Sequence, residues 1–273
     1  PYLLCLEGSC VPDSQGQFSV SLVSGTSASA PSFAGIMALV VDAQNRVRQG
    51  QADYTLYRLA AAESAYPTQC NGSNTTTPPA TTCIFNDVTV GNNVVPGEVG
   101  TQYQANAGYD LTTGLGSVNV ANLVNAWSAS TFSPTTTALK LNSGVTPITV
   151  PHGTSVNVSI TVAPNSGTVM PKGEASLIAT AGGASGSGLE GYTLMNGSIT
   201  STTDQLPGGT LYAVHAHYAG DGAFAPSDST PPIMVTVTAE SSTTTVSAFN
   251  QSVQGSPQIL PNTTLPFGTG VFV

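Results

Sequence analysis

Charged residues are scarce in this sequence, and basic residues are the scarcest. Only 7% of its 273 residues are charged, with 5 lysines and arginines against 14 aspartates and glutamates. Nucleic-acid binding needs basic side chains that displace the counterions of the phosphates, so this balance excludes a nucleic-acid partner. The low charge does not predict disorder, because 40% of the residues are hydrophobic and can form a buried core.

The first 151 residues contain no histidine, and the sequence contains no long hydrophobic run. The first histidine is His152, which disfavours a Ser-His-Asp triad completed within the preceding residues. His215 and His217 share one face of a predicted strand, which is more typical of a half-exposed surface than of a metal site. No uninterrupted apolar run reaches the roughly 18 residues of a membrane span, so we expect none.

Cysteine is rare and occurs as two close pairs, Cys5 with Cys10 and Cys70 with Cys83. Each local pairing closes a short loop, and neither spacing is typical of a metal site. We predict two disulfides and therefore an oxidising, extracellular location; four reduced thiols are the alternative. The chain starts at Pro1 without a signal peptide and stops inside an alternating run, so we expect a piece of a longer secreted protein.

A serine stands at the start of a predicted buried helix. Residues 24–31 read SGTSASAP and lead into an apolar run at helical spacing, which places Ser27 in the first turn. Free N–H groups and the partial positive charge at a helix start stabilise negative charge that develops near a serine oxygen. Gly25 allows a substrate to come close, and Pro31 suits a first helical turn. The alternative is that Ser27 is only an N-cap.

The pattern around this serine predicts further elements. They are a strand over 18–23, a helix from Ser27 to about Gln49 with Gly50 after it and Arg46 and Arg48 in its last turn, a helix over 52–62, a Thr- and Pro-rich surface loop over 64–83 and a helix over 120–127. A strand, a tight turn and a helix in this order hold a nucleophile at the end of a sheet.

Two motifs resemble one peptidase family. SGTSASAP carries the Gly-Thr-Ser-x-x-x-Pro pattern of the subtilisins and the sedolisins. IFNDVTVGNN at 84–93 and YQANAGYDLTTGLGS at 103–117 resemble the calcium-binding end of the sedolisins, which are serine-carboxyl peptidases that include kumamolisin. The resemblance covers about residues 1–130. It implies that residues 1–127 are the C-terminal portion of an α/β, subtilisin-like peptidase domain.

The resemblance also implies a calcium (Ca2+) site. Its ligands would be the side chains of Asp87 and Asp110 and the backbone oxygens of Val88, Asn106 and Gly108. Such a set of oxygen ligands on turns suits calcium. The family usually has glycine where Asn106 stands, and asparagine tolerates left-handed angles better than most residues. The alternative is that both aspartates only cap turns.

The implied activity is that of a secreted serine-type endopeptidase, which cleaves protein or peptide substrates through an acyl-enzyme at acidic pH. In sedolisins the base is a glutamate oriented by an aspartate, and a further aspartate stabilises the oxyanion; all three lie upstream of the nucleophile. Only Glu7 and Asp13 precede Ser27, and neither lies in a recognisable version of those motifs. We therefore expect this piece to be inactive alone, because a serine hydroxyl needs a nearby base.

The character of the sequence changes after Trp127. Residues 128–137 are rich in Ser, Thr and Pro and predict a linker. Short alternating runs separated by turns predict an all-β, immunoglobulin-like sandwich over 138–239. YAGDG at 218–222, followed by Ser227, resembles bacterial immunoglobulin-like repeats, and a second, truncated copy is predicted over 240–273.

Two other functions compete with the peptidase. The chain could be a catalytically dead, peptidase-like scaffold in a cell-surface binding or adhesion protein, which keeps the fold and lacks the base. It could also belong to a subtilisin-like enzyme with its histidine upstream. For the β repeats, a spacer role, polysaccharide or cell-surface adhesion, and substrate tethering are equally open, because a fold does not determine a function.

Overall fold

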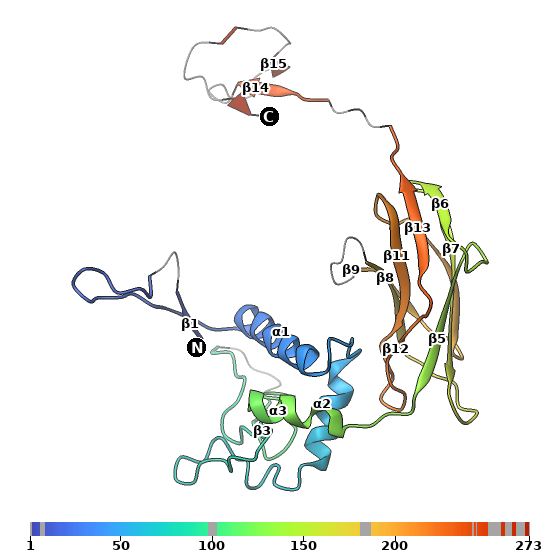
Figure 1. The fold of residues 1–273 in the computed structure, drawn as a ribbon. Helices are drawn as coiled ribbons and strands as arrows, with labels where there is room; N and C mark the ends of the chain where they lie inside the picture. The colour runs from blue at the N-terminus through green and yellow to red at the C-terminus, as the bar shows by residue number, and fades with distance from the viewer. Residues whose placement is uncertain are drawn as a thin grey trace.

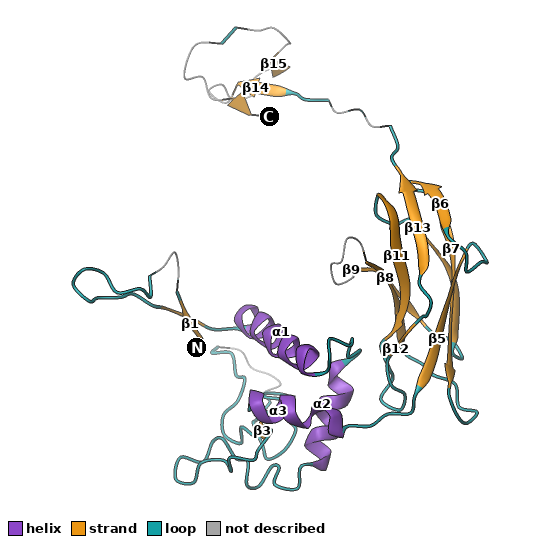
Figure 2. Ribbon diagram, viewed as in Figure 1, coloured by secondary structure: helices purple, strands orange, loops and turns teal. Residues whose placement is uncertain are grey.

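The computed structural model describes residues 2–5, 9–97, 103–180 and 187–241, and the short segments 243, 245–250, 258–259, 264–265 and 271–272. The described chain forms a helical unit followed by a β-sandwich (Figures 1 and 2). The second predicted repeat falls largely outside the described residues. Within it the structure gives three short strands, β14 (Ala248–Asn250), β15 (Gln258–Ile259) and β16 (Val271–Phe272).

The helical unit contains three helices, one 3₁₀ turn and two short ribbons. The elements are α1 (Thr26–Ala43), α2 (Ala52–Ala62), α3 (Val120–Ala126), η1 (Trp127–Ala129), the ribbon of β1 (Tyr2–Leu4) with β2 (Ser21–Val23) and the ribbon of β3 (Phe85–Asn86) with β4 (Ser117–Val118). Its small core consists of Val40, Leu59, Ala60, Phe85, Leu123 and Trp127. These residues join α1, α2 and α3 around β3.

Helix α1 is shorter than its sequence pattern predicts. It ends at Ala43 instead of about Gln49, because Asn45 and Arg46 take left-handed backbone angles, with φ of 56° and 62°. Neither Arg46 nor Arg48 therefore lies in its last turn. Helix α2 matches its predicted bounds, and the predicted strand before Ser27 is confined to β2.

The β-sandwich consists of two sheets that enclose one core. One sheet has the order β10 (Ser198–Thr203), β7 (Val156–Pro164), β5 (Thr135–Leu141). The other has the order β6 (Ile148–Pro151), β13 (Ile233–Thr238), β11 (Gly209–Tyr218), β8 (Glu174–Thr180), β9 (Ser187–Thr193), with β12 (Ser227–Asp228) also beside β11. The pairs are antiparallel except β6 with β13.

Alternation in the sequence explains how these strands pack. In β7 the side chains of Val156, Val158, Ile160 and Val162 are buried, and the residues between them face outward or lie at the edge. The sandwich begins at Thr135, so the last residues of the predicted linker belong to β5. Threonine is β-branched and suits a strand, and Thr137 continues the buried face.

The structure bears on two further expectations. Both disulfides form as predicted, Cys5 with Cys10 and Cys70 with Cys83. Within the described residues, α1 is the one helix long and apolar enough to cross a membrane by length and composition. Core helices of globular proteins also meet this criterion, and α1 carries three serines, an aspartate and a proline.

Candidate functional site

Ser27 occupies the second position of α1 and is exposed. The N-cap is Gly25, whose φ of 104° is readily adopted only by glycine, and whose carbonyl accepts from the N–H groups of Ala28 and Ser29. Ser27 is therefore not the N-cap. The glycine turn instead places its side chain on the first turn, where backbone N–H groups point out of the helix.

Pro31 lies in the second turn of α1, and the predicted first-turn position is wrong because the helix already starts at Thr26. Proline has no N–H, so the carbonyl of Ser27 receives no hydrogen bond from the residue four positions later. Ser29 and Ser32 donate their hydroxyls back to the carbonyls of Gly25 and Ala28, at 3.2 and 2.8 Å. The hydroxyl of Ser27 has no such partner among the described residues.

A groove beside Ser27 is lined by the side chains of β1, β2 and the start of α1. Its lining residues are Leu3, Leu4, Val23, Ser24, Ser27, Ala28, Pro31 and Ser32. None of these carries a carboxylate or an imidazole. Within the described chain, Ser27 thus lies in an apolar groove with no side chain in it that could take its proton.

The structure brings together the residues predicted to hold calcium. Asp87 follows β3 and is fully buried, and Asp110 is 8% exposed. The N–H of Gly108 donates to Asp87 Oδ2 at 2.8 Å, and the N–H of Asn106 donates to Asp110 Oδ2 at 2.9 Å. One loop therefore contacts both carboxylates.

Thr113 links the remaining predicted ligand to this pair. Its hydroxyl lies 3.2 Å from each carboxylate oxygen of Asp110 and 3.4 Å from the carbonyl oxygen of Val88. The N–H groups of Thr112 and Thr113 also donate to Asp110 Oδ1, both at 2.8 Å. All five predicted residues thus belong to one cluster.

The two carboxylates differ in electrostatic environment. Burial raises the pKa of Asp87, and the negative charge of Asp110 adds to this, while the hydrogen bond from Gly108 opposes it. The hydrogen bond from the N–H of Asn106 is the main cause that lowers the pKa of Asp110. Burial, together with the charges of Asp87 and Asp110, also raises the pKa of Tyr66 to about 12. Negative charge is therefore concentrated here.

Three buried oxygens at the cluster lack a hydrogen bond of ordinary geometry among the described residues: Asp87 Oδ1, Thr112 Oγ1 and the hydroxyl of Tyr66. The hydroxyl of Tyr66 nevertheless lies close enough to Asp87 to oppose the rise that burial causes in the pKa of Asp87. A buried carboxylate oxygen without a well-formed hydrogen bond is costly, and a bound cation would remove that cost. Two neighbouring carboxylates and the nearby carbonyl of Val88 are oxygen ligands of the kind that calcium prefers, so these residues fit the ion; Asn106 and Gly108 contact the carboxylates through their N–H groups.

Three residues that the sequence did not single out for the cluster hold Asp87 in place. The backbone carbonyl of Cys70, whose side chain forms a disulfide with Cys83, accepts from the N–H of Asp87 at 2.7 Å. The N–H of Gly72 donates to the carbonyl of Asp87, also at 2.7 Å. The carboxylate of Glu63 accepts from the N–H of Ile84 at 2.6 Å and from the N–H of Phe85, the first residue of β3, at 3.4 Å. Because both nearby cysteines are oxidised, Glu63 is no part of a thiolate metal site.

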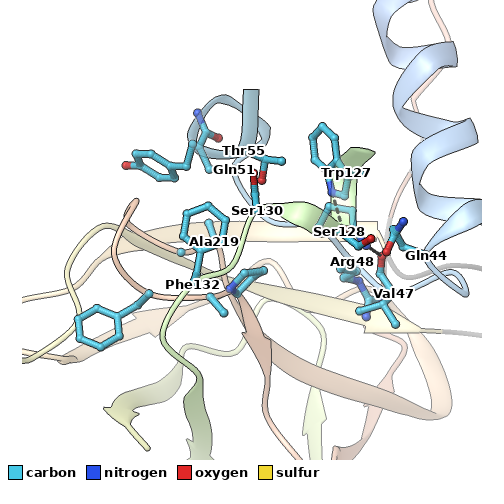
Figure 3. A pocket seen from close by; sticks show the side chains of 16 residues that line it. Gln44, Val47, Arg48, Gln51, Thr55, Trp127, Ser128, Ser130, Phe132 and Ala219 are labelled. Carbon is cyan, nitrogen blue, oxygen red and sulfur yellow. Dashed lines mark hydrogen bonds between the residues drawn. The ribbon is translucent and has the colours of Figure 1, made fainter. Parts of the chain in front are cut away.

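A second hollow of about 290 Å³ lies between the helical unit and the sandwich. Figure 3 shows that residues of the helical unit, among them Trp127 and Thr55, and residues of the sandwich, such as Ala219, border it. The indole N–H of Trp127 donates to Gln49 Oε1 at 2.8 Å, so the polar atom of this side chain is already bonded. The lining includes Arg48 and no acidic residue.

Comparison with known protein families finds a match to part of the chain. Residues 141–240 match the family described as the bacterial Ig-like domain (group 3). The match covers most of the sandwich and confirms the predicted bacterial immunoglobulin-like repeat. No curated protein matches the chain. The sedolisin resemblance of residues 1–130 stays a prediction.

Proposed function

We propose that the helical unit is part of the catalytic domain of a secreted serine-type endopeptidase of the sedolisin kind, with Ser27 as the nucleophile. The observation that carries the proposal is the placement of Ser27. It is exposed on the first turn of an apolar helix, behind a glycine N-cap, in the sequence SGTSASAP. The two disulfides agree with secretion.

In the proposed reaction, Ser27 Oγ attacks the carbonyl carbon of a peptide bond while a base takes the hydroxyl proton. The amine product leaves with a proton, and water then hydrolyses the acyl-enzyme to release the acid and restore the serine. Backbone N–H groups at the start of α1 would stabilise the oxyanion. Carboxyl groups would carry the protons, which favours acidic pH.

The base must come from outside the groove that the structure describes. Helix α1 and the β1–β2 ribbon expose apolar side chains, with Leu39 55%, Leu3 69% and Leu22 67% exposed. Apolar faces of this kind are typical of surfaces that another polypeptide covers. We infer that the covering polypeptide also carries the glutamate and aspartates, so residues 1–273 alone would be inactive.

Calcium would have a structural role in this enzyme. The side chains of Asp87 and Asp110 would hold the ion, together with the backbone oxygens of Val88, Asn106 and Gly108. The ion would supply positive charge between two buried carboxylates and tie the chain after β3 to the loop at 106–113. It would stabilise the unit without contacting the substrate.

The second candidate is a catalytically dead scaffold in a cell-surface binding protein. The absence of any base in the described groove beside Ser27 favours it, as does the bacterial Ig-like domain that follows. The two proposals differ in whether the complete protein hydrolyses peptides through Ser27.

The test is hydrolysis of an unfolded protein substrate between pH 3 and 5, with wild-type protein and with Ser27→Ala. We expect no Ser27-dependent cleavage by residues 1–273, and cleavage by the protein joined to its native preceding chain that Ser27→Ala abolishes. Ser32→Ala, a nearby serine whose hydroxyl bonds to a helix carbonyl, is the matched control and should keep activity. Equal cleavage by wild-type and Ser27→Ala protein, or none by either, would leave the scaffold as the better conclusion.

A further inference from the structure

An ion pair joins the helical unit to the β-sandwich. Nη1 of Arg48, in the loop between α1 and α2, lies 2.9 Å from Oδ2 of Asp228 in β12. The other oxygen of Asp228 lies 2.6 Å from Nδ1 of His217 in β11. Asp228 is thus held on the sandwich side before it meets Arg48, so the pair loses less side-chain entropy than a mobile surface pair does.

A second arginine contacts the sandwich, at Gly222, and the segment that leads into it, at Thr131 and Phe132. Arg58 in α2 donates to the carbonyls of Thr131 and Gly222, the latter at 2.6 Å. Its guanidinium carbon also lies 4.0 Å from the centroid of the Phe132 ring, within the range of a cation–π interaction. The planar group with several N–H donors suits this geometry, which a lysine would not reproduce. The chain has only three arginines, and two of them serve this junction.

Glycines let the two backbones approach closely here. Gln51 N donates to the carbonyl of Ala219 at 2.8 Å. A Cβ at Gly50, which has φ of +67°, would lie 2.7 Å from Cβ of Pro226 and collide with the carbonyl oxygen of Ala219. A Cβ at Gly222 would lie 2.9 Å from the ring of Tyr54 in α2. The hollow in Figure 3 is therefore surrounded by direct contacts between the units.

The anchoring of α1 makes this junction important for Ser27. Val40, close to the C-terminal end, is the one fully buried residue of α1. Ser27 lies roughly 20 Å further along the helix axis, at a rise of about 1.5 Å per residue. A tilt of about 10° at the anchored end would move Ser27 by roughly 3 to 4 Å over that length.

We infer that the Ig-like domain is fixed against α2 and the α1–α2 loop, so that it and the helical unit form one rigid body. Arg48 and Arg58 act as the clamp, and the junction sets the direction in which α1 carries Ser27. The Ig-like domain is then neither a mobile spacer nor a freely tethered binding module. The inference does not depend on any peptidase activity.

The test measures distances between spin labels on the full 273-residue chain. The described residues include no free cysteine, so introduced cysteines can be labelled selectively. One pair, Ala61→Cys with Lys140→Cys, reports on α2 against the sandwich; a second, Ala34→Cys with Lys140→Cys, reports on α1. We expect one narrow distance for each pair in the otherwise wild-type chain.

Two matched comparisons separate the clamp from general destabilisation. Arg48→Ala combined with Arg58→Ala should broaden both distances, whereas Arg46→Ala should not, because Arg46 pairs only with exposed Asp42 of its own unit. Gly50→Ala should broaden them too, while Gly16→Ala, at a similar φ of +76° in open space, should not.

Circular dichroism checks that each variant is folded before its distances are compared. Broad distances in the otherwise wild-type chain would overturn the inference. So would distances that stay narrow in the folded Arg48→Ala, Arg58→Ala protein and in the folded Gly50→Ala protein. A narrow Ala61 distance with a broad Ala34 distance in the wild-type chain would show that α1 moves independently, which contradicts the part of the inference that concerns Ser27.

Discussion

The β-sandwich and the helical unit have similar hydrophobic patterning but bury very different shares of it. In the sandwich, the alternating residues of strands such as β7 and β8 meet across two sheets and are almost wholly removed from solvent. In the helical unit, α1 carries a long apolar run, yet Val40 is its one fully buried residue. The sandwich encloses its own core, whereas most of the large apolar side chains of α1 are only partly buried and Leu39 is exposed.

This difference shows that a hydrophobic pattern predicts a helix or a strand but does not determine which other element will bury its apolar face. A sandwich closes on itself because each sheet provides the face that the other buries. A helix that is apolar around most of its circumference needs neighbours on several sides, and α2 and α3 cover only the region around Val40.

Truncation of a buried leucine in the sandwich should have the largest effect, and truncation of an exposed leucine on α1 a much smaller one. Leu177→Ala in β8 removes a fully buried side chain and should lower the free energy of unfolding by about 3 kcal/mol. Leu39→Ala in α1, where the leucine is 55% exposed, should change it by less than about 0.5 kcal/mol. Urea unfolding followed by circular dichroism measures both. Equal losses would mean that Leu39 is buried in solution. If Leu39→Ala lowers the stability only when these residues are part of a longer protein, the added residues contain the polypeptide that covers α1.

Calcium should stabilise the helical unit selectively. At a concentration about 100-fold above its dissociation constant, a bound ion adds roughly 2.7 kcal/mol to the free energy of unfolding. Trp127, the only tryptophan, lies in the core of the helical unit, so its fluorescence reports on that unit during thermal unfolding. Calcium should raise the midpoint temperature of this unfolding transition, and a chelator should reverse the rise.

Asp110→Asn should abolish the calcium effect, because it removes one of the two clustered carboxylates. Asp13→Asn is the matched control, since the Asp13 carboxylate accepts hydrogen bonds from the N–H groups of Gln15 and Gln17 in an exposed loop far from the cluster in sequence. A calcium-induced rise that persists in Asp110→Asn, or that is absent in the wild-type chain, would contradict the proposed site.

Lowering the pH should weaken the junction between the helical unit and the sandwich. This is the smallest of the predicted effects. Burial alone would raise the pKa of Asp228, but the hydrogen bond and charge of His217 and the charge of Arg48 outweigh it and bring that pKa below the ordinary 3.8. Its stabilising contribution is therefore complete above about pH 4 and is lost as pH falls through the lower, folded value.

Thermal unfolding between pH 6 and 2.5 tests this dependence. The stability difference between wild-type and Asp228→Asn protein should shrink as the pH drops below about 4. Asp42→Asn, which breaks the exposed pair with Arg46, should show a much smaller difference throughout, since exposed pairs contribute little. If the stability difference between wild-type and Asp228→Asn protein stayed constant with pH, it would contradict the stabilising role given to the ionised Asp228 carboxylate.

Local patterns in the sequence were enough for several elements. Helix α2, an all-β sandwich after Trp127 and both disulfides follow from spacing and periodicity. The end of α1 did not, because two successive left-handed residues, Asn45 and Arg46, stop a helix that its composition would continue. The start of the sandwich at Thr135 was missed because a Ser-, Thr- and Pro-rich run has the composition of a linker, although threonine also suits strands.

The sequence by itself determined which residues could carry chemistry: the serine motif at Ser27 and the two aspartates, Asp87 and Asp110, on glycine-rich turns. Only the tertiary structure decided that these aspartates bury one carboxylate oxygen that lacks a hydrogen bond of ordinary geometry and that Glu63 and the Cys70 disulfide loop hold the strand before Asp87. It also decided that the sandwich packs against α2. These contacts join residues far apart in the chain, and their geometry depends on burial and close backbone approach, which no local pattern records.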